Sequence, residues 1–377
     1  MAIGGGKGEK LKKIIIIGGG LGGLTAANLL ARSGFQVQLV EKKRYPFHRV
    51  CGEYISNEVK DFLIRSGLYP DIEPSSFNEF IYTSTKGSSH KMPLDLGAFG
   101  VSRYVLDEFL AKKARSTGVE VFEGTDVLNI EKEGNNFHVY TKNGDHLIAD
   151  FVIGAFGKTS SLDRTLKRNF ITKESPYIGV KYHIKTDFPK NQIALHNFKS
   201  GYCGISAIEE EKYNLCYLGQ RSVLKTHKSI EEMEENVLCQ NPFLKEIFNN
   251  SEFLFDKPEV INAFSFKPKE PVVNGIFMVG DAAGLITPLC GNGMAMAIHS
   301  AKILAELIDE NHDKGHDWLT EKYSHTWKKT FAKRLWFGRQ VQRLFGSGPS
   351  SEIAVSLMKN SPFVARQIMK NTHGQPV

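Results

Sequence analysis

The sequence predicts an α/β fold in which a parallel sheet layered with helices is interrupted by an inserted antiparallel sheet and followed by a helical region. Three observations support this prediction. An apolar strand near the amino end leads into a glycine-rich turn and a helix, a second strand–turn–helix unit follows late in the chain, and alternating strands occupy the stretch between them. Both ends of the chain are therefore expected to build one layered domain.

The composition is that of an ordinary globular protein with room for two domains. The chain has 377 residues, of which 41% are hydrophobic and 24% charged, and its formal net charge is +7. This mild positive charge suits an anionic cofactor, an anionic substrate or a membrane surface, although most such charges are simply solvated. It comes without a recognised nucleic-acid-binding motif, so no nucleic-acid partner is expected.

Cysteine usage and the amino end predict a cytoplasmic protein. The five cysteines are odd in number and include no C-x-x-C pair, which argues against a disulfide framework or a metal site. Such usage is typical of a reducing compartment. The apolar run 14–17 is too short for a signal sequence or a membrane span, and "MAIGGGKGE" before Lys10 reads as a flexible leader.

The amino-terminal strand–turn–helix–strand unit predicts a dinucleotide site. Residues 14–17 form a continuous apolar strand, as expected where both faces of a parallel sheet are covered. The G-x-G-x-x-G spacing then allows a tight turn, a close approach of backbone to a pyrophosphate, and packing of helix on strand. A second strand, 36–40, ends at an acid placed to accept hydrogen bonds from a ribose. The predicted cofactor contacts of this unit are Gly18, Gly20, Leu21, Gly22, Gly23, Glu41 and Lys42.

A second unit lies near the other end of the chain, in "GIFMVGDAAGLITPLCGNGMAMAIHSAKILAELI". A strand, 276–279, runs into Gly280 and Asp281, and a loop with further glycines leads into a helix with an apolar stripe. A glycine-rich backbone at the amino end of a helix presents N–H donors to negative charge. This unit is therefore expected to supply the second half of the cofactor site.

The loop after Asp281 resembles the flavin-contacting motif of the superfamily of FAD-dependent aromatic hydroxylases and geranylgeranyl reductases, the flavin monooxygenase-like oxidoreductases. The resemblance spans most of the chain. It implies FAD as the cofactor, held in a Rossmann-like domain of the glutathione-reductase type. In that family the aspartate bonds the ribityl chain, and the proline and Gly-x-Gly that follow line the isoalloxazine ring. The contacts implied here are Gly280, Asp281, Pro288, Gly291, Asn292, Gly293 and Met294.

Two intermediate elements fit the same resemblance. In "VSRYVLDEFLAKKARSTG", Ser102 reads as a helix N-cap, and the family places an arginine such as Arg103 on the FAD phosphates. In "VIGAFGKTSSLDR", the turn "GAFG" resembles a Gly-Ala-Asp-Gly turn that ends at Gly157 and holds FAD. Phe156 stands where many relatives have the aspartate. FAD binding is expected to survive, whereas hydroxylase-style use of NADPH is disfavoured; the alternative is harmless drift within a flavoprotein.

The segment "RVCGEYISNEV" resembles the Cys-Gly-Glu or Cys-Gly-Gly segment found beside the flavin in geranylgeranyl reductases. Gly52 lets the chain pass close to a ligand, and a thiol and a carboxyl are both proton donors. Cys51 and Glu53 are therefore the predicted catalytic residues. The alternative for Cys51 is a small buried apolar side chain.

Residues 175–218 predict an antiparallel sheet, because β-branched and aromatic residues alternate there between charged turns. Within it, "GYCGISAIEEEKYNLCYL" resembles the strand that forms the substrate wall in geranylgeranyl reductases. The resemblance implies a hydrophobic small-molecule substrate in contact with Tyr202, Ile205 and Pro288. Ordinary packing is the alternative for the aromatic residue.

The predicted FAD-binding domain is discontinuous, with a substrate-binding sheet inserted and a basic helical region at the end. That last region is either a solvated helix or a peripheral membrane contact, so the protein is expected to be cytoplasmic or membrane-associated. The predicted segments are 1–75, 101–168 and 270–312 for the FAD-binding domain, 76–100 and 169–269 for the sheet domain, and 313–377 for the helical region.

The leading functional hypothesis is an FAD-dependent reductase of carbon–carbon double bonds in an isoprenoid or polyketide-like substrate, with hydride delivered from flavin N5. The alternatives are an FAD-dependent monooxygenase acting on an aromatic or lipophilic substrate and, more remotely, a non-catalytic prenyl-binding chaperone. A halogenase is disfavoured, because no W-x-W-x-I-P motif is present and the three tryptophans all lie in the helical tail. The electron donor stays open among NADPH, NADH and a ferredoxin-like protein.

Overall fold

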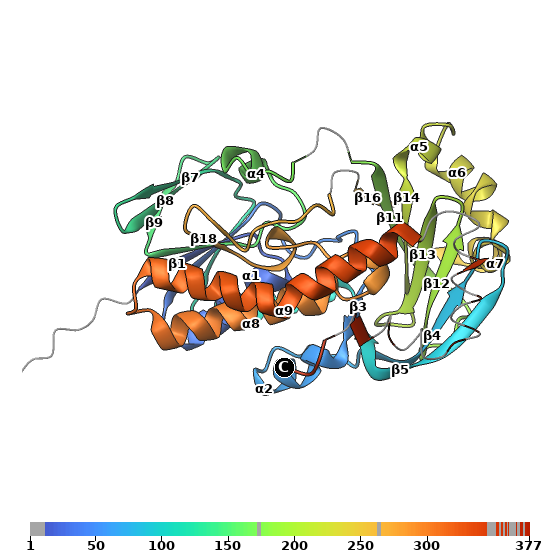
Figure 1. The fold of residues 1–377 in the computed structure, drawn as a ribbon, viewed down its shortest axis with the longest axis horizontal. Helices are drawn as coiled ribbons and strands as arrows, with labels where there is room; N and C mark the ends of the chain where they lie inside the picture. The colour runs from blue at the N-terminus through green and yellow to red at the C-terminus, as the bar shows by residue number, and fades with distance from the viewer. Residues whose placement is uncertain are drawn as a thin grey trace, which may run out of the picture.

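The computed structural model describes residues 12–171, 175–261 and 265–344, together with residues 352–353, 356, 359, 361, 367, 370–371 and 374–377. The leader before Lys10 lies outside the described residues, as does most of the chain after residue 344. Figure 1 shows two lobes, and a long helix near the carboxyl end, α9 (His316–Leu344), reaches from the first toward the second.

The first lobe is built on a six-stranded sheet with the order β17-β18-β10-β1-β2-β6. Strand β1 pairs in parallel with both β2 and β10, whereas β17 runs antiparallel to β18. The isoleucines of β1 are buried on both sides of the sheet, which explains their unbroken apolar run. The strands are β1 (Lys13–Ile17), β2 (Gln36–Glu41), β6 (Glu120–Glu123), β10 (Phe151–Gly154), β17 (Val272–Val273) and β18 (Ile276–Met278).

Three helices pack together in this lobe and bring the cofactor motifs close to one another. Helix α1 contacts both α3 and α8. The predicted N-cap of α3, Ser102, is confirmed. Gly20 is the N-cap of α1, and Gly34 and Gly118 follow the two helices with φ of +88° and +87°. The bounds are α1 (Leu21–Arg32), α3 (Arg103–Ser116) and α8 (Gly293–Asn311).

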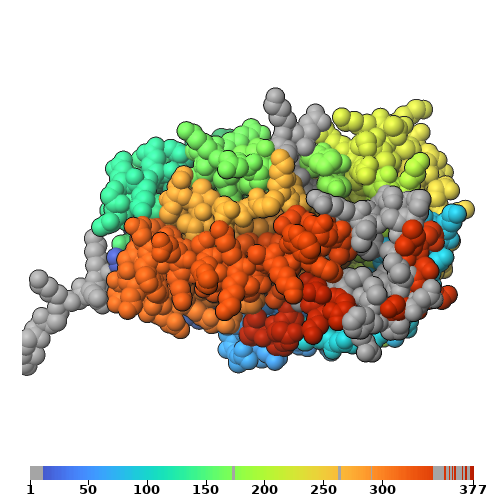
Figure 2. All heavy atoms as spheres, viewed as in Figure 1, coloured from blue at the N-terminus to red at the C-terminus, as the bar shows by residue number. Residues whose placement is uncertain are grey.

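A small three-stranded sheet and helix α9 complete the first lobe. Phe137 and Val139 of the small sheet join the same apolar core as β1 and α8, and Tyr323 of α9 donates a hydrogen bond of 2.7 Å to the carbonyl of Met278. In Figure 2 the orange atoms of α8 and α9 form a continuous ridge along the first lobe. The strands are β7 (Val127–Glu133), β8 (Asn136–Thr141) and β9 (His146–Ala149).

The second lobe is a nine-stranded sheet with the order β15-β11-β14-β13-β12-β4-β5-β3, and β16 pairs with β11. The antiparallel ladder predicted for residues 175–218 is confirmed by β11, β14, β13 and β12. Strand β12 also pairs with β4 in parallel. Strand β3 pairs with β5 in this sheet, although its residues lie within segment 1–75 of the predicted FAD-binding domain. The strands are β3 (Tyr54–Ser56), β4 (Ser75–Thr83), β5 (Ser89–Gly100), β11 (Tyr177–Lys185), β12 (Gln192–Phe198), β13 (Gly201–Ala207), β14 (Tyr213–Gln220), β15 (Glu252–Phe253) and β16 (Glu259–Ile261).

Helices α6 and α7 cover one face of the large sheet, where Met233 and Leu244 enter an apolar core with the strands. The other face lines the cavity described below. Among the helices that the structure describes, none is long and apolar enough to cross a membrane. The remaining helices are η1 (Asn57–Val59), α2 (Lys60–Arg65), α4 (Ser161–Thr165), α5 (Arg221–Leu224), α6 (Ile230–Asn236), η2 (Leu238–Gln240), α7 (Pro242–Asn250), η3 (Gly280–Ala282) and η4 (Pro288–Cys290).

Candidate active site

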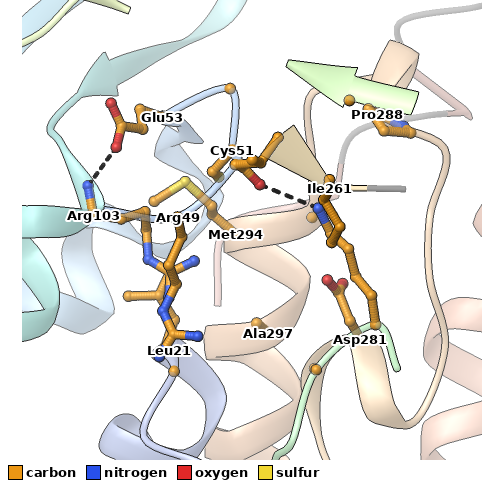
Figure 3. Close-up of a pocket in the computed structure, with 18 of the residues that line it drawn as sticks. Leu21, Arg49, Cys51, Glu53, Arg103, Ile261, Asp281, Pro288, Met294 and Ala297 are labelled. Atoms are coloured by element: carbon orange, nitrogen blue, oxygen red, sulfur yellow. Dashed lines mark hydrogen bonds between the residues drawn. The ribbon is translucent and has the colours of Figure 1, made fainter. Parts of the chain in front are cut away.

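A cavity of about 530 Å³ lies where the carboxyl ends of β1, β2 and β10 meet the second lobe (Figure 3). It is lined by both glycine-rich turns, by residues 48–54, by Arg103 and by strands of the large sheet. All residues predicted to bind cofactor or substrate, or to act in catalysis, border this cavity except Gly23 and Asn292. Stretches that are far apart in the sequence therefore converge on a single site.

The first glycine-rich turn is open toward the cavity and tightly packed behind it. A Cβ on Gly23 would collide with the carbonyl oxygen of Gly18. Gly23 is thus needed for contact between α1 and β1, which corrects its prediction as a cofactor contact. At Gly20 the nearest neighbour of such a Cβ is Nη2 of Arg103, 3.5 Å away. Gly20 therefore faces a cation at the amino end of α1.

Glu41 ends β2 with its carboxylate turned back toward the glycine turn. It accepts hydrogen bonds from the backbone N–H groups of Gly19 at 2.8 Å and Lys43 at 3.0 Å, and from Arg49 at 3.2 Å. Arg49, which was not predicted from the sequence, also donates to Asp107 of α3 at 3.0 Å. No spacing rule could have found it, because its two carboxylate partners lie on different elements.

Arg103 begins α3 and binds the same buried aspartate as Arg49. Its guanidinium makes two hydrogen bonds of 2.7 Å to Asp107. Burial alone would lower the pKa of Arg103, but the adjacent Asp107 carboxylate outweighs burial and raises the pKa above its usual value. Two guanidinium groups therefore share one carboxylate next to Gly20.

These groups fit the diphosphate of FAD. Glu41 and Asp107 balance the two positive charges of Arg49 and Arg103, so the cluster carries no net negative charge that would repel an anion. The guanidinium groups are therefore available to bind a diphosphate. The N–H groups at the start of α1 face the same space and favour an anion further. The Glu41 carboxylate also borders the cavity, where a ribose diol could reach it.

The second glycine-rich turn forms the opposite border of the cavity. Asp281 lies in η3, directly after β18, and Gly291 follows η4 with φ +63°. A Cβ on Gly291 would lie 3.2 Å from the ring of Tyr54, so a side chain there is both strained and crowded. Asn292 points away from the cavity and donates to the buried carboxylate of Glu58 at 3.2 Å. Its prediction as a cofactor contact is thereby corrected, because the side chain supports the start of α8 from behind.

Phe156 lies in the cavity wall in the turn after β10. Its ring packs beside Gly154, where an added Cβ would lie 2.8 Å from Cε1 of the ring. Gly157 follows with φ +81° and has open space where a side chain would be. This part of the wall is therefore apolar, since a phenyl ring offers a cofactor neither charge nor a hydrogen-bond acceptor.

Glu53 has a left-handed backbone, with φ +52°, and its side chain is completely buried. The carboxylate accepts hydrogen bonds from the backbone N–H of Arg103 at 2.7 Å (Figure 3), from Lys181 at 2.5 Å and from His183 at 2.7 Å. Burial alone would raise the pKa of this carboxyl, but Lys181 and His183 outweigh it and lower the pKa below its usual value. A carboxylate held in this way suits a positioning role, and the predicted catalytic role of Glu53 stays a prediction.

Cys51 borders the same cavity as a half-buried free thiol. Its neighbours in the chain are tied to both lobes: Lys158 donates to the carbonyl of Val50 at 3.2 Å, and Ser206 of β13 donates to the carbonyl of Gly52 at 3.2 Å. The thiol is therefore held at the junction between the turn after β10 and the large sheet.

His48 also lines the cavity and was not predicted. Its ring stacks on Tyr104 and meets His183 edge-on. Burial, followed by the positive charge of Lys181, lowers the pKa of His48 to about 4. This imidazole is therefore neutral near pH 7.

The large sheet supplies the apolar part of the cavity. Tyr202 and Ile205 both border it, but three residues along a strand place their side chains on opposite faces. Tyr202 packs with Leu218 and Leu285, while the Ile205 side chain is buried in the core under α6 and α7. Ile205 thus borders the cavity with its side chain on the strand face opposite to Tyr202, and its predicted substrate contact stays a prediction. The apolar lining residues include Phe80, Tyr82, Met92, Leu94, Leu195, Leu218, Leu285 and Leu289.

Comparison with known proteins agrees with this site. Residues 12–336 match the family described as FAD binding domain. The chain is 24% identical over 317 residues to the tryptophan 2-halogenase of Chondromyces crocatus, which covers 78% of this chain and 60% of that protein's length. It is 28% identical over 329 residues to the digeranylgeranylglycerophospholipid reductase of Thermoplasma volcanium, which covers 79% of each chain.

A solved structure has the same fold. It is a geranylgeranyl bacteriochlorophyll reductase-like protein from Thermoplasma acidophilum, with a TM-score of 0.77 at 18% identity, over 96% of this chain and 95% of that one. The family match spans both glycine-rich turns and Arg103, the groups that fit a dinucleotide. The chain therefore belongs to the FAD binding domain family, within the flavin monooxygenase-like superfamily of FAD-dependent oxidoreductases.

Proposed function

We propose that the chain reduces carbon–carbon double bonds in an apolar small molecule. The observation that carries this proposal is one cavity bordered by the two cofactor turns at one end and by apolar side chains of the large sheet at the other. Bound FAD, once reduced, supplies the hydride. The likeness to a digeranylgeranylglycerophospholipid reductase supports an isoprenoid-type substrate, and a polyketide-like chain suits the same wall.

The chain's own residues orient the substrate, exclude water and provide a proton. Saturation of a double bond places a hydride on one carbon and a proton on the other, and the sulfur of Cys51 is the group that we assign to hold this proton. The thiolate left behind regains a proton from solvent. Glu53 and His48 border the same cavity but are held ionised and neutral, so we assign them to positioning the thiol-bearing segment.

A second candidate is an FAD-dependent oxygenase, in which oxygen rather than an alkene reacts in the cavity. The likeness to a tryptophan 2-halogenase favours it. The absence of W-x-W-x-I-P from the sequence weighs against halogenation, and the apolar Phe156 weighs against hydroxylase-style reduction by NADPH. We therefore keep hydroxylation of an aromatic or lipophilic substrate as this alternative.

We also propose how electrons and substrate arrive. A ferredoxin-like protein, NADH or NADPH is the electron donor, with the protein donor favoured by Phe156. Helix α9 carries Lys329, Lys333 and the exposed Trp336, and its Val341 borders the cavity. A peripheral membrane contact through this helix would bring a lipid-like substrate from the cytoplasmic side of a bilayer to the site.

Single-turnover chemistry without oxygen tests the proposal. The holoenzyme is reduced with dithionite and mixed with isoprenoid and polyketide-like alkenes, while flavin absorbance and product mass are followed. We expect flavin reoxidation together with a product heavier by two hydrogens. The proposal fails if every alkene leaves the flavin reduced while oxygen and an aromatic substrate give a hydroxylated or halogenated product.

A further inference from the structure

Lys269 is a buried lysine that belongs to none of the motifs described above. It precedes β17 and is 7% exposed. Its ammonium donates to the carbonyl of Lys158 at 2.8 Å and to the carbonyl of Asp281 at 2.7 Å. These two carbonyls belong to the two turns that border the cofactor part of the cavity. A single side chain thus joins turns that are far apart in the sequence.

Arg168 reinforces the same connection. It donates to the carbonyl of Ala282 at 2.8 Å and forms a buried ion pair of 2.9 Å with Asp163. Both cations lie over the ring of Phe170, with the Lys269 nitrogen 4.4 Å and the Arg168 guanidinium carbon 4.9 Å from the ring centroid. The turn that carries Asp281 is therefore held by two buried cations.

The two cations differ in what balances their charge. Arg168 is paired with a carboxylate, whereas the ammonium of Lys269 donates to two carbonyl oxygens. A buried ammonium is costly unless its hydrogen bonds are made, and here its charge is not cancelled by a directly bonded acid. The positive charge of Lys269 would therefore favour an anion in the adjacent cavity.

We propose that Lys269 is a positioning residue for FAD. It holds the turns 155–158 and 280–282 at a fixed separation, so that Asp281 is presented to the cofactor, and its positive charge favours the anionic dinucleotide. This role goes beyond assigning FAD to the cavity, because Lys269 does not border the cavity and acts through the two turns.

Equilibrium binding of FAD to the apoprotein tests the proposal without any assay of turnover. We expect Lys269→Met to weaken binding at pH 7 at least tenfold, measured by quenching of flavin fluorescence. Lys267→Met is the matched control, because Lys267 lies on the same segment with an exposed side chain. Equal affinities of the two variants would overturn the proposal.

The pH dependence of FAD binding separates a charged role from a merely structural one. Burial lowers the pKa of Lys269 to about 8, against the raising effect of Asp281 and Asp163 and with the lowering effect of Arg168 and Lys158. FAD affinity of the native protein is therefore expected to be full below pH 8 and to fall above it, by about tenfold per pH unit at most. Lys269→Met is expected to lose this pH dependence.

Lys269→Arg keeps the test decisive if the methionine variant does not fold. A guanidinium stays protonated throughout pH 6.5–9, so this variant should bind FAD at pH 7 and keep its affinity as the pH rises. Identical pH profiles for the native protein and Lys269→Arg would show that Lys269 does not act through its charge, and the proposal would fall.

Discussion

Cys51 and Glu53 are two residues apart in the chain but have different chemistry in the fold. Their sequence segment predicted that both would act on substrate, and both border the cavity. The partners that fix Glu53 as a carboxylate, Lys181 and His183, lie on β11, more than a hundred residues later. A local pattern contains no information about such distant partners. For the same reason Arg49, which bonds two carboxylates on different elements, was not predicted.

The first prediction concerns the thiol. Cys51→Ser is expected to slow alkene saturation by the dithionite-reduced enzyme on the order of 100-fold, because a hydroxyl is a far weaker acid than a thiol in the same place. FAD binding should not change. Single-turnover mass spectrometry without oxygen measures the effect, and Cys239→Ser, a half-buried cysteine outside the cavity lining, is the control. Native rates in both variants would leave Cys51 as part of the wall only.

A second prediction concerns the buried carboxylate. Glu53→Gln leaves Lys181 buried without its ion-pair partner, so the free energy of unfolding at pH 7 should fall by about 3–5 kcal/mol. Because the folded protein lowers the pKa of Glu53, its contribution is present above the unfolded pKa and is lost as the pH falls through the folded pKa. Urea unfolding of both proteins from pH 7 to pH 3 measures this. The double variant Glu53→Gln with Lys181→Met is the control, and it should recover part of the loss.

At the scale of elements, the sequence predicted best what is decided locally. The start of α3 follows from its N-cap Ser102, whose side chain bonds within the first turn of the helix, and this cap was confirmed. Side-chain direction was predicted less well. Ile205 faces away from the cavity because strands alternate, and Asn292 faces away because Glu58 binds it. Such directions depend on register and on neighbours, which the motifs alone do not give.

The left-handed turn before α8 supports a third prediction. Gly291→Ala adds a Cβ 3.2 Å from the Tyr54 ring at a residue with φ +63°, so the turn must shift where it meets the cofactor. We expect a strain of about 1–2 kcal/mol and weaker FAD binding. The control is Gly34→Ala, which has φ +88° and open space around the added atom, far from the cavity. It should lower the melting temperature without changing FAD affinity, and equal FAD affinities for both variants would contradict the prediction.

A fourth prediction concerns the carboxyl group of Glu234, which lies where helix α6 packs on the large sheet. Burial raises the pKa of Glu234 to about 7, although hydrogen bonds from Tyr217 and Tyr182 oppose the rise. The protonated carboxyl stabilises the fold fully below its unfolded pKa, and this contribution is lost as the pH rises through about 7. A shift of this size corresponds to roughly 3 kcal/mol. Denaturation of the native protein from pH 4.5 to pH 8 should show the decline, whereas Glu234→Gln should be flat; parallel curves would contradict it.

At the scale of the whole molecule, the cofactor layer joins an early and a late segment of the chain. Strand β1 lies between β2 and β10, and β10 pairs with β18, so the first and last motifs meet in one sheet. That both units share one sheet was predictable, because two strand–turn–helix units that hold one dinucleotide must lie at the same edge of the fold; that β10 lies between them was not. The parallel pairing of β12 with β4 was not predictable, because nothing in either strand specifies its partner.

The fifth prediction follows from this joining of two segments. Glu41→Ala and Asp281→Ala remove acids from the early and the late segment that border the same cavity. Each should weaken FAD binding by about 1.5–3 kcal/mol, the usual worth of a hydrogen bond to a charged group, which corresponds to roughly 10-fold to 150-fold in Kd. Flavin content after gel filtration and fluorescence titration measure this. Full flavin occupancy in both variants would show that FAD lies elsewhere.

The hydrogen bonds between the lobes also determine which hybrid proteins will fold. Glu53 binds β11, the N–H of Ser102 donates to Glu209 at 2.8 Å, and Ser206 binds the segment beside Cys51. A sheet transplanted from another flavoprotein to change the accepted substrate must therefore supply partners for these groups. A graft that replaces Lys181 with an apolar residue would leave the buried carboxylate of Glu53 without its lysine ion-pair partner, even if the grafted sheet fits the new substrate. Shuffling libraries that move β11 together with residues 48–54 should contain more folded members than libraries cut between them.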